Sequence, residues 1–165
     1  MNNNEPVWMS TARALIGTKE APGAADNPVI LSWAKKLGGW EGQYYQHDEI
    51  PWCSLFVTHV LEENSIHGPR GFLAAKSYLN WGDKCTPVPG AILVFGRDGG
   101  GHVGFYVGED TNSYHVLGGN QSDMVCIKAL PKDRLLDARW PSGVAMGNAK
   151  PNFIKASVSK SVKED

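Results

Sequence analysis

The chain has 165 residues, of which 42% are hydrophobic and 20% charged, and these fractions are ordinary for one soluble globular domain. Its formal net charge of −1 gives no strong field toward nucleic acid or an anionic membrane surface. No segment is apolar over the length of a transmembrane span. We therefore expect no nucleic-acid partner and no membrane insertion.

Helical periodicity dominates the first half of the chain. Apolar residues at helical spacing, bounded by capping residues, glycine and proline, predict four helices with a polar loop over residues 40–50. The predicted helices cover residues 8–16, 28–37, 51–66 and 74–81.

The second half changes to short apolar runs separated by polar or glycine-rich turns, which is typical of strands. The predicted strands cover residues 91–95, 102–108, 113–119, 124–130 and 137–141. Helices followed by an antiparallel sheet indicate the α+β class, with a single domain over residues 1–148. Residues 149–165 are polar and predict a flexible tail.

The three cysteines, Cys53, Cys85 and Cys126, are widely spaced and odd in number. They form neither a CxxC pair nor a disulfide framework, so at least one thiol is free, which suits synthesis in a reducing compartment. The first ten residues, MNNNEPVWMS, have neither the basic region nor the apolar core of a secretory signal peptide. We expect synthesis in the cytoplasm without such a signal.

Cys53 is the strongest candidate for chemistry because it lies at the first turn of a predicted helix, directly after Pro51 and Trp52. The positive end of the helix dipole favours a thiolate there. A free cysteine is more often a small buried apolar residue. Cys85, in a turn, and Cys126, within a strand, lack the setting of Cys53.

His102 is the candidate base, because it opens a predicted strand directly after three glycines. A lone histidine is more often structural, but a cysteine at a helix start with a histidine at a strand start is the pair that nucleophilic catalysis requires. A third group should orient the imidazole. We favour Asn120, although an asparagine beside Gly118-Gly119 also suits a turn. His115, in the middle of the same strand, is the alternative.

Short motifs extend over residues 8–141, and in combination they resemble the CHAP branch of papain-like peptidoglycan hydrolases. Small single-domain members of that branch occur in phage lysis modules and among secreted antibacterial toxins. The matching elements are Gly17, Glu20 and Gly23; Asn27-Pro28; Asp48, Pro51-Trp52-Cys53 and Phe56-Val57; Trp81-Gly82; Pro89-Gly90-Ala91-Ile92; Gly101-His102-Val103-Gly104-Phe105-Tyr106; Leu117-Gly118-Gly119-Asn120-Gln121; and Arg139-Trp140-Pro141.

The resemblance implies a papain-like α+β fold in which the catalytic cysteine begins a helix packed on a C-terminal antiparallel sheet. It places the nucleophile on Cys53, the base on His102 and the orienting residue on Asn120. The related NlpC-type enzymes use a histidine as the third residue, which keeps His115 open. Many relatives have Pro-Gly-Asp where this chain has Pro89-Gly90-Ala91, a difference that touches no catalytic role.

The expected reaction is hydrolysis of an amide in the peptide stem or crosslink of peptidoglycan, or of the bond that joins stem to glycan. The backbone N–H of Cys53 is a ready oxyanion donor. We expect no cofactor and no metal, since the acids Asp48 and Glu49 before a helix are more often favourable charges at its N-terminus. Substrate contacts or a second oxyanion donor are expected from Trp52, Tyr45, Gln46, Asp48 and Gln121.

Peptidoglycan lies outside the inner membrane, so we expect delivery to the periplasm by a phage holin or by a contact-dependent (type VI) secretion apparatus. A secreted antibacterial effector is favoured, together with a periplasmic immunity protein that occludes the cleft around Cys53 and His102. Two alternatives use the same residues differently. One is a cytosolic cysteine peptidase or deamidase of proteins, and the other is a catalytically silent module that binds cell wall.

Overall fold

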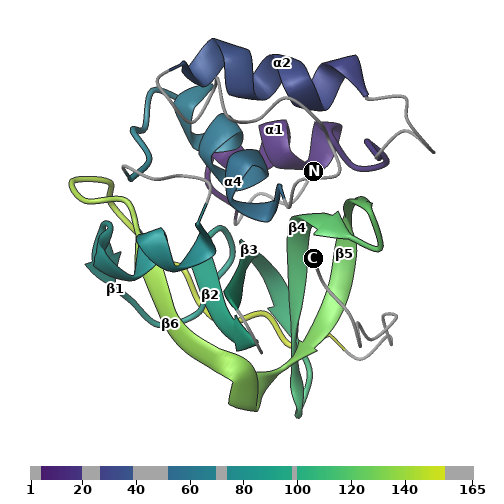
Figure 1. Cartoon of the computed structure of the whole chain (residues 1–165). Coiled ribbons are helices and arrows are strands. Elements are labelled where there is room, and N and C mark those ends of the chain that lie inside the picture. Colours follow the sequence, from purple (N-terminus) through teal and green to yellow (C-terminus); the bar gives the residue numbers. More distant parts are fainter. Residues whose placement is uncertain (1–4, 20–26, 39–51, 70–73, 98–99, 155–165) are drawn as a thin grey trace.

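A computed structural model of the protein describes residues 5–19, 27–38, 52–69, 74–97 and 100–154 (Figure 1). Within these residues there are three α-helices in the first half of the chain and a six-stranded antiparallel sheet in the second. The predicted α+β class is therefore confirmed. None of the described helices is long and apolar enough to cross a membrane.

The helices begin close to where the sequence predicts them. Asn27 caps the second helix, because its side-chain oxygen accepts a hydrogen bond of 2.8 Å from the N–H of Val29. The short helix expected after residue 74 is a 3₁₀ helix, as the hydrogen bond of 3.2 Å from Trp81 N to the carbonyl of Tyr78 shows. The helices are α1 (Trp8–Ala14), α2 (Pro28–Leu37), α4 (Cys53–Glu62), and the 3₁₀ helices η1 (Ala75–Asn80) and η2 (Lys132–Arg134).

The sheet has the strand order β1-β6-β2-β3-β4-β5, so the last strand returns to lie between β1 and β2. Each hydrogen-bonded pair is antiparallel. The strands are β1 (Asp83–Lys84), β2 (Ile92–Arg97), β3 (Gly100–Glu109), β4 (Ser113–Gln121), β5 (Met124–Pro131) and β6 (Leu135–Trp140).

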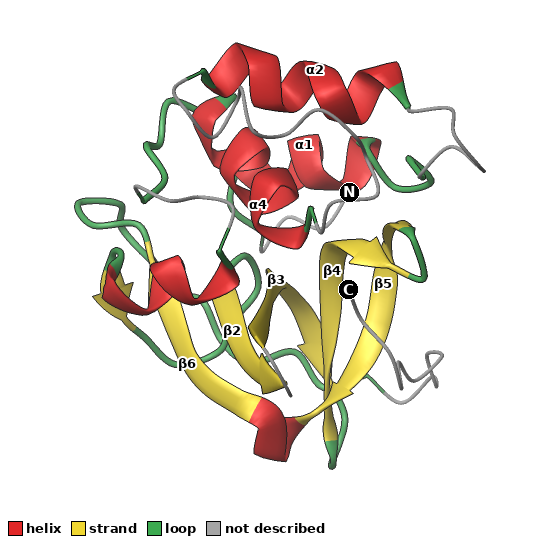
Figure 2. Cartoon of the chain, viewed as in Figure 1, coloured by secondary structure: helices red, strands yellow, loops and turns green. Residues whose placement is uncertain are grey.

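Helix α4 packs against β3 and β4 and also contacts α1 and α2, and Figure 2 shows the α-helices gathered on one side of the strands. Every residue from Cys53 to Leu61 is buried, so this helix has no solvent-facing side along most of its length. The rings of Phe56 on α4 and Phe105 on β3 meet edge to face, with 6.0 Å between their centroids. This packing holds the start of α4 against the central strands.

The segment after the last strand is ordered further than the sequence predicts. The N–H of Glu109 donates to the carbonyl of Asn152, and the N–H of Ile154 donates to the carbonyl of Glu109, both at 2.8 Å. The side chain of Ile154 packs over Gly108, where any larger residue would collide with it. Residues 152–154, within the segment expected to be a flexible tail, thus lie against β3, because a glycine in β3 leaves room for an apolar side chain to dock.

Candidate active site

Cys53 is the first residue of α4, and its side chain is 5% exposed. The N-cap residue, Trp52, makes no side-chain hydrogen bond to the helix start. The first N–H groups of a helix are not used by its own hydrogen bonds, so this end of α4 suits an oxygen that carries negative charge. The location predicted for Cys53 is thus the one the structure has.

Trp52 is fully buried, with its ring 6.1 Å from that of Trp33 on α2. Its side chain offers no surface to a substrate in this structure. Trp52 instead packs the start of α4 against α2, so the expectation that it contacts substrate gives way to a structural role.

His102 lies in β3, fully buried, with its Nε2 2.8 Å from Oε1 of Gln121. The Gln121 amide is held in one orientation, because its Nε2 donates to the carbonyls of Val116 at 3.1 Å and Cys126 at 2.8 Å. Its oxygen must therefore face the imidazole, which means that His102 Nε2 carries a proton. In the neutral ring the lone pair is then on Nδ1, which is the nitrogen that can act as a base.

Two glycines of β4 bring His102 and the start of α4 to the same end of the sheet. A Cβ atom on Gly118 would lie 3.3 Å from His102 Nε2, and one on Gly119 would lie 2.6 Å from the Cβ of Phe56. Gly119 would also meet the Trp52 ring at 2.9 Å. Because these positions have no side chain, the strand approaches the imidazole on one side and the first turn of α4, which contains Cys53, on the other.

Asn120, expected to orient the imidazole, makes no hydrogen bond to it in this structure. Neither polar atom of its buried side chain has a hydrogen-bond partner among the described residues. The pairing of β4 with β5 shifts register between Gly118 and Gln121, and Asn120 has a left-handed φ of 57°. This irregularity brings the next residue, Gln121, to His102. Gln121, expected to contact substrate or an oxyanion, thus contacts the His102 imidazole in this structure.

His115 is also buried, but its Nε2 lies 2.9 Å from Oδ2 of Asp110 in the turn between β3 and β4. This hydrogen bond lowers the pKa of the Asp110 carboxyl below its ordinary value. His115 precedes Gln121 by six residues of one strand, or about 20 Å at ~3.3 Å per residue. The structure therefore does not bring His115 to the candidate site.

The other residues named from the sequence either are not part of the candidate site or lie outside the residues that the structure describes. Tyr45, Gln46 and Asp48 lie outside the described residues. Within the described ranges, no group of three or more His, Cys, Asp or Glu side chains is placed to hold a metal ion. Burial raises the pKa of the Cys85 thiol to about 11 and also raises that of Cys126. Neither thiol is thereby favoured as a nucleophile.

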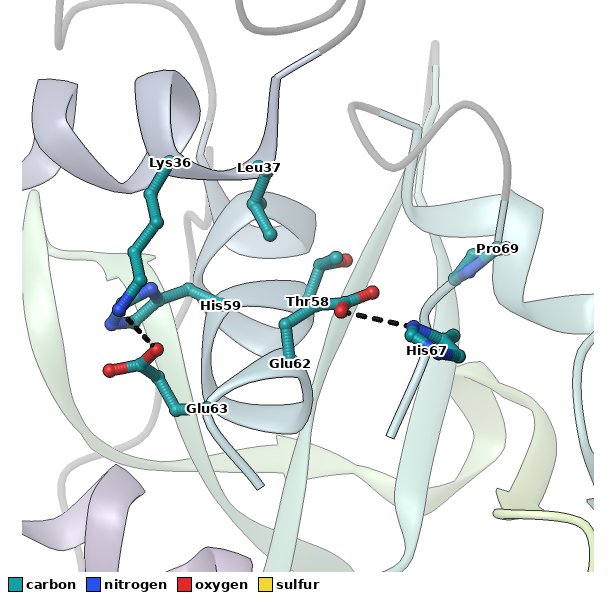
Figure 3. A pocket seen from close by; sticks show the side chains of 8 residues that line it. All are labelled: Lys36, Leu37, Thr58, His59, Glu62, Glu63, His67 and Pro69. Carbon is teal, nitrogen blue, oxygen red and sulfur yellow. Dashed lines mark hydrogen bonds and ion pairs between the residues drawn. The ribbon is translucent and has the colours of Figure 1, made fainter. Parts of the chain in front are cut away.

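A pocket of about 420 Å³ lies beside the later turns of α4 (Figure 3). Two ion pairs border it, Lys36 with Glu63 at 2.6 Å and His67 with Glu62 at 3.2 Å. At ~1.5 Å per residue, the lining residues from Thr58 to Glu63 are about 7.5–15 Å along the axis from the helix start, and neither Cys53 nor His102 lines the pocket. The pocket is therefore separate from the candidate site. Its lining residues are Lys36, Leu37, Thr58, His59, Glu62, Glu63, His67 and Pro69.

Comparison of the sequence with models of known protein families gives no match, and a search of curated proteins gives none either. The candidate site comprises a cysteine at a helix N-terminus and a buried histidine whose tautomer is set by a fixed glutamine amide.

Proposed function

We propose that this protein is a cysteine-dependent amide hydrolase with a papain-like arrangement of its site. Cys53 is the nucleophile, His102 the base and Gln121 the residue that orients the base. The observation that carries the proposal is the hydrogen bond of 2.8 Å between His102 Nε2 and Gln121 Oε1. With the proton fixed on Nε2, the lone pair is on Nδ1. Abstraction of a proton from a thiol requires a nitrogen with such a lone pair.

The proposed reaction has two halves. Nδ1 of His102 takes the thiol proton, the Cys53 thiolate attacks the amide carbon, and the carbonyl π electrons move onto oxygen. The tetrahedral intermediate collapses with cleavage of the C–N bond, and the imidazolium protonates the departing amine. Water, deprotonated by the same imidazole, then attacks the thioester and releases the acid and the thiol.

The surroundings of the three residues support this chemistry. His102 and Gln121 have no exposed surface, and Cys53 has little. Charge interactions are stronger in such a water-poor site than in bulk solvent. The N-terminus of α4 directs its N–H groups and the positive end of its dipole at the position where the oxyanion develops.

We propose peptidoglycan peptide as the substrate, on the motifs around Pro51-Trp52-Cys53, Gly101-His102-Val103-Gly104 and Gly118-Gly119-Asn120-Gln121. Their resemblance to CHAP-type hydrolases supports a bond in the stem, in the crosslink or between stem and glycan. In this proposal the protein acts in the periplasm as a secreted effector or a phage lysin. A periplasmic immunity protein that covers the cleft would protect the cells that make it.

Digestion of purified sacculi tests the reaction. Wild-type protein should release soluble fragments whose masses name the bond cut, whereas a folded Cys53→Ala variant should release none. The Cys85→Ala variant is the matched control and should match the wild type. Sacculi that bind wild-type protein without releasing fragments would identify a wall-binding module instead.

Expression in a Gram-negative host tests the compartment. Protein carrying an added export signal should lyse cells in a manner that depends on Cys53, and the same chain without the signal should be harmless. Equal toxicity from both compartments would point to a cytosolic protein substrate and contradict the cell-wall proposal.

A further inference from the structure

Asn120 combines two unfavourable features at one position. Its side chain is fully buried, yet neither Oδ1 nor Nδ2 has a hydrogen-bond partner among the described residues. Its backbone also has φ of 57°, in the left-handed region that favours glycine. A buried amide without partners and a strained backbone each destabilise a fold, and where both occur they indicate a functional constraint.

The position of Asn120 relates it to both catalytic groups. The residue before it, Gly119, packs directly on Trp52 and Phe56 in the first turn of α4. The residue after it, Gln121, holds the imidazole of His102. Asn120 is therefore the residue of β4 that lies between the contact with the nucleophile's helix and the contact with the base.

We propose that the side-chain Nδ2–H of Asn120 is the second donor of the oxyanion hole, alongside the backbone N–H of Cys53. This inference rests on the proposed function, because it assigns a role in that same reaction. A carbonyl oxygen of the substrate becomes negatively charged only when the Cys53 thiolate adds to the carbon. The Asn120 amide, which has no hydrogen-bond partner among the described residues, then gains a strong, charge-assisted hydrogen bond that the free protein does not provide.

The unsatisfied state of Asn120 in the free protein fits this role. A donor that already had a protein acceptor would lose that bond on meeting the oxyanion. A donor without a protein acceptor loses no such bond, and its destabilising effect is already present in the free protein. The inference therefore makes opposite predictions for stability and for turnover when the amide is removed.

The test uses Asn120→Gly and, as matched control, Ser122→Gly. Ser122 also has a left-handed φ, of 54°, but its side chain is exposed. Both substitutions relieve backbone strain, so both should raise the melting temperature. Only Asn120→Gly should lower kcat on sacculi or a defined muropeptide, by about 100-fold or more with little change in KM, as expected for an oxyanion donor. Ser122→Gly should keep the wild-type kcat.

Asn120→Asp provides a second variant of nearly the same shape. A carboxylate accepts hydrogen bonds and repels an oxyanion, so it should lower kcat at least as much as Asn120→Gly does. Affinity for a peptide aldehyde, whose thiohemiacetal imitates the tetrahedral intermediate, should fall in parallel with kcat in both variants.

Three results would overturn the inference. The first is an Asn120→Gly variant with unchanged kcat, and the second is one in which only KM changes. The third is an Asn120→Gly variant that keeps the wild-type affinity for the peptide aldehyde. Wild-type protein that releases nothing from sacculi contradicts the proposed function itself, and the inference with it, so the two failures are distinguishable.

Discussion

Nε2 of His102 and Oε1 of Gln121 lie 2.8 Å apart in a part of the sheet with no exposed surface on either residue. The glutamine cannot rotate freely, because its nitrogen is bonded to two backbone carbonyls of neighbouring strand positions. A side chain fixed in this way sets both the tautomer and the angle of the imidazole. Substitutions that alter this hydrogen bond therefore test the proposed site most directly.

Replacement of Gln121 by alanine should lower kcat by about 10- to 100-fold. The substitution removes a buried hydrogen bond worth roughly 1–3 kcal/mol, and ~1.4 kcal/mol corresponds to a tenfold change in rate. Gln121→Glu keeps an acceptor toward His102 but loses the donors to the carbonyls of Val116 and Cys126. Compared with Gln121→Ala, the Gln121→Glu variant should therefore lose more unfolding free energy for a given loss of kcat. Urea denaturation measures the unfolding free energy of each variant. A folded Gln121→Ala variant with full kcat would contradict the orienting role.

Gly118→Ala should disturb the same hydrogen bond without removing either partner. The added Cβ would lie 2.7 Å from Gln121 Oε1 and 3.3 Å from His102 Nε2, so the amide must shift. We expect a lower kcat with a comparatively small change in melting temperature. Gly100→Ala on β3 is the control, since a Cβ there meets no atom within 4 Å. Equal kcat values for the two variants would argue against a sensitive His102–Gln121 geometry.

Alkylation at neutral pH should distinguish the three thiols. Burial raises the pKa of Cys85 to about 11, so at pH 7 only about one Cys85 thiol in ten thousand is ionised. Burial raises the pKa of Cys126 as well. A small reagent such as iodoacetamide should therefore modify Cys53 first, and loss of activity should follow modification of that residue by mass spectrometry. Faster modification of Cys85 than of Cys53 would contradict the assignment of the nucleophile.

His59 should make the fold sensitive to mild acid. Burial lowers the pKa of its imidazole below the ordinary 6.5, although Glu63 opposes the shift and Lys36 adds to it. The unfolded chain then binds this proton more readily than the folded protein does. The contribution of His59 to stability is thus complete above about pH 6.5 and declines as the pH falls below that value.

Urea denaturation at pH 7.5 and pH 5 measures this effect. His59→Phe retains an aromatic ring against Trp33, which stacks on His59 at 4.9 Å, and should reduce the loss of unfolding free energy at pH 5. His67→Gln is the control, because the His67 side chain is 90% exposed. If His59→Phe loses as much stability on acidification as the wild type, another group is responsible.

Local features of the sequence were sufficient for several conclusions. The Asn27-Pro28 pair predicts the start of α2 because a side-chain cap and a proline act within one turn. The position of Cys53 at a helix start follows from the proline before it and the apolar residues after it. The change from helical to strand periodicity near residue 90 is likewise local, and it predicts the α+β class.

The identity of the orienting residue depends on tertiary structure. Asn120 and Gln121 are adjacent amides, and a register shift of one residue exchanges which of them faces His102. Periodicity does not reveal such a shift, because it depends on how β4 pairs with β5. Periodicity does not predict the hydrogen-bond partner of His115 either, because Asp110 meets it only when the β3–β4 turn closes.

Long-range packing also decided where the chain ends meet the sheet. The return of β6 between β1 and β2, and the docking of residues 152–154 on β3, join segments that are far apart in sequence. Both depend on space and free hydrogen-bonding groups that exist only after the sheet has formed. Sequence alone thus determined which residues could do chemistry, and the tertiary structure decided which of them meet, because side-chain contacts follow strand register and not residue type.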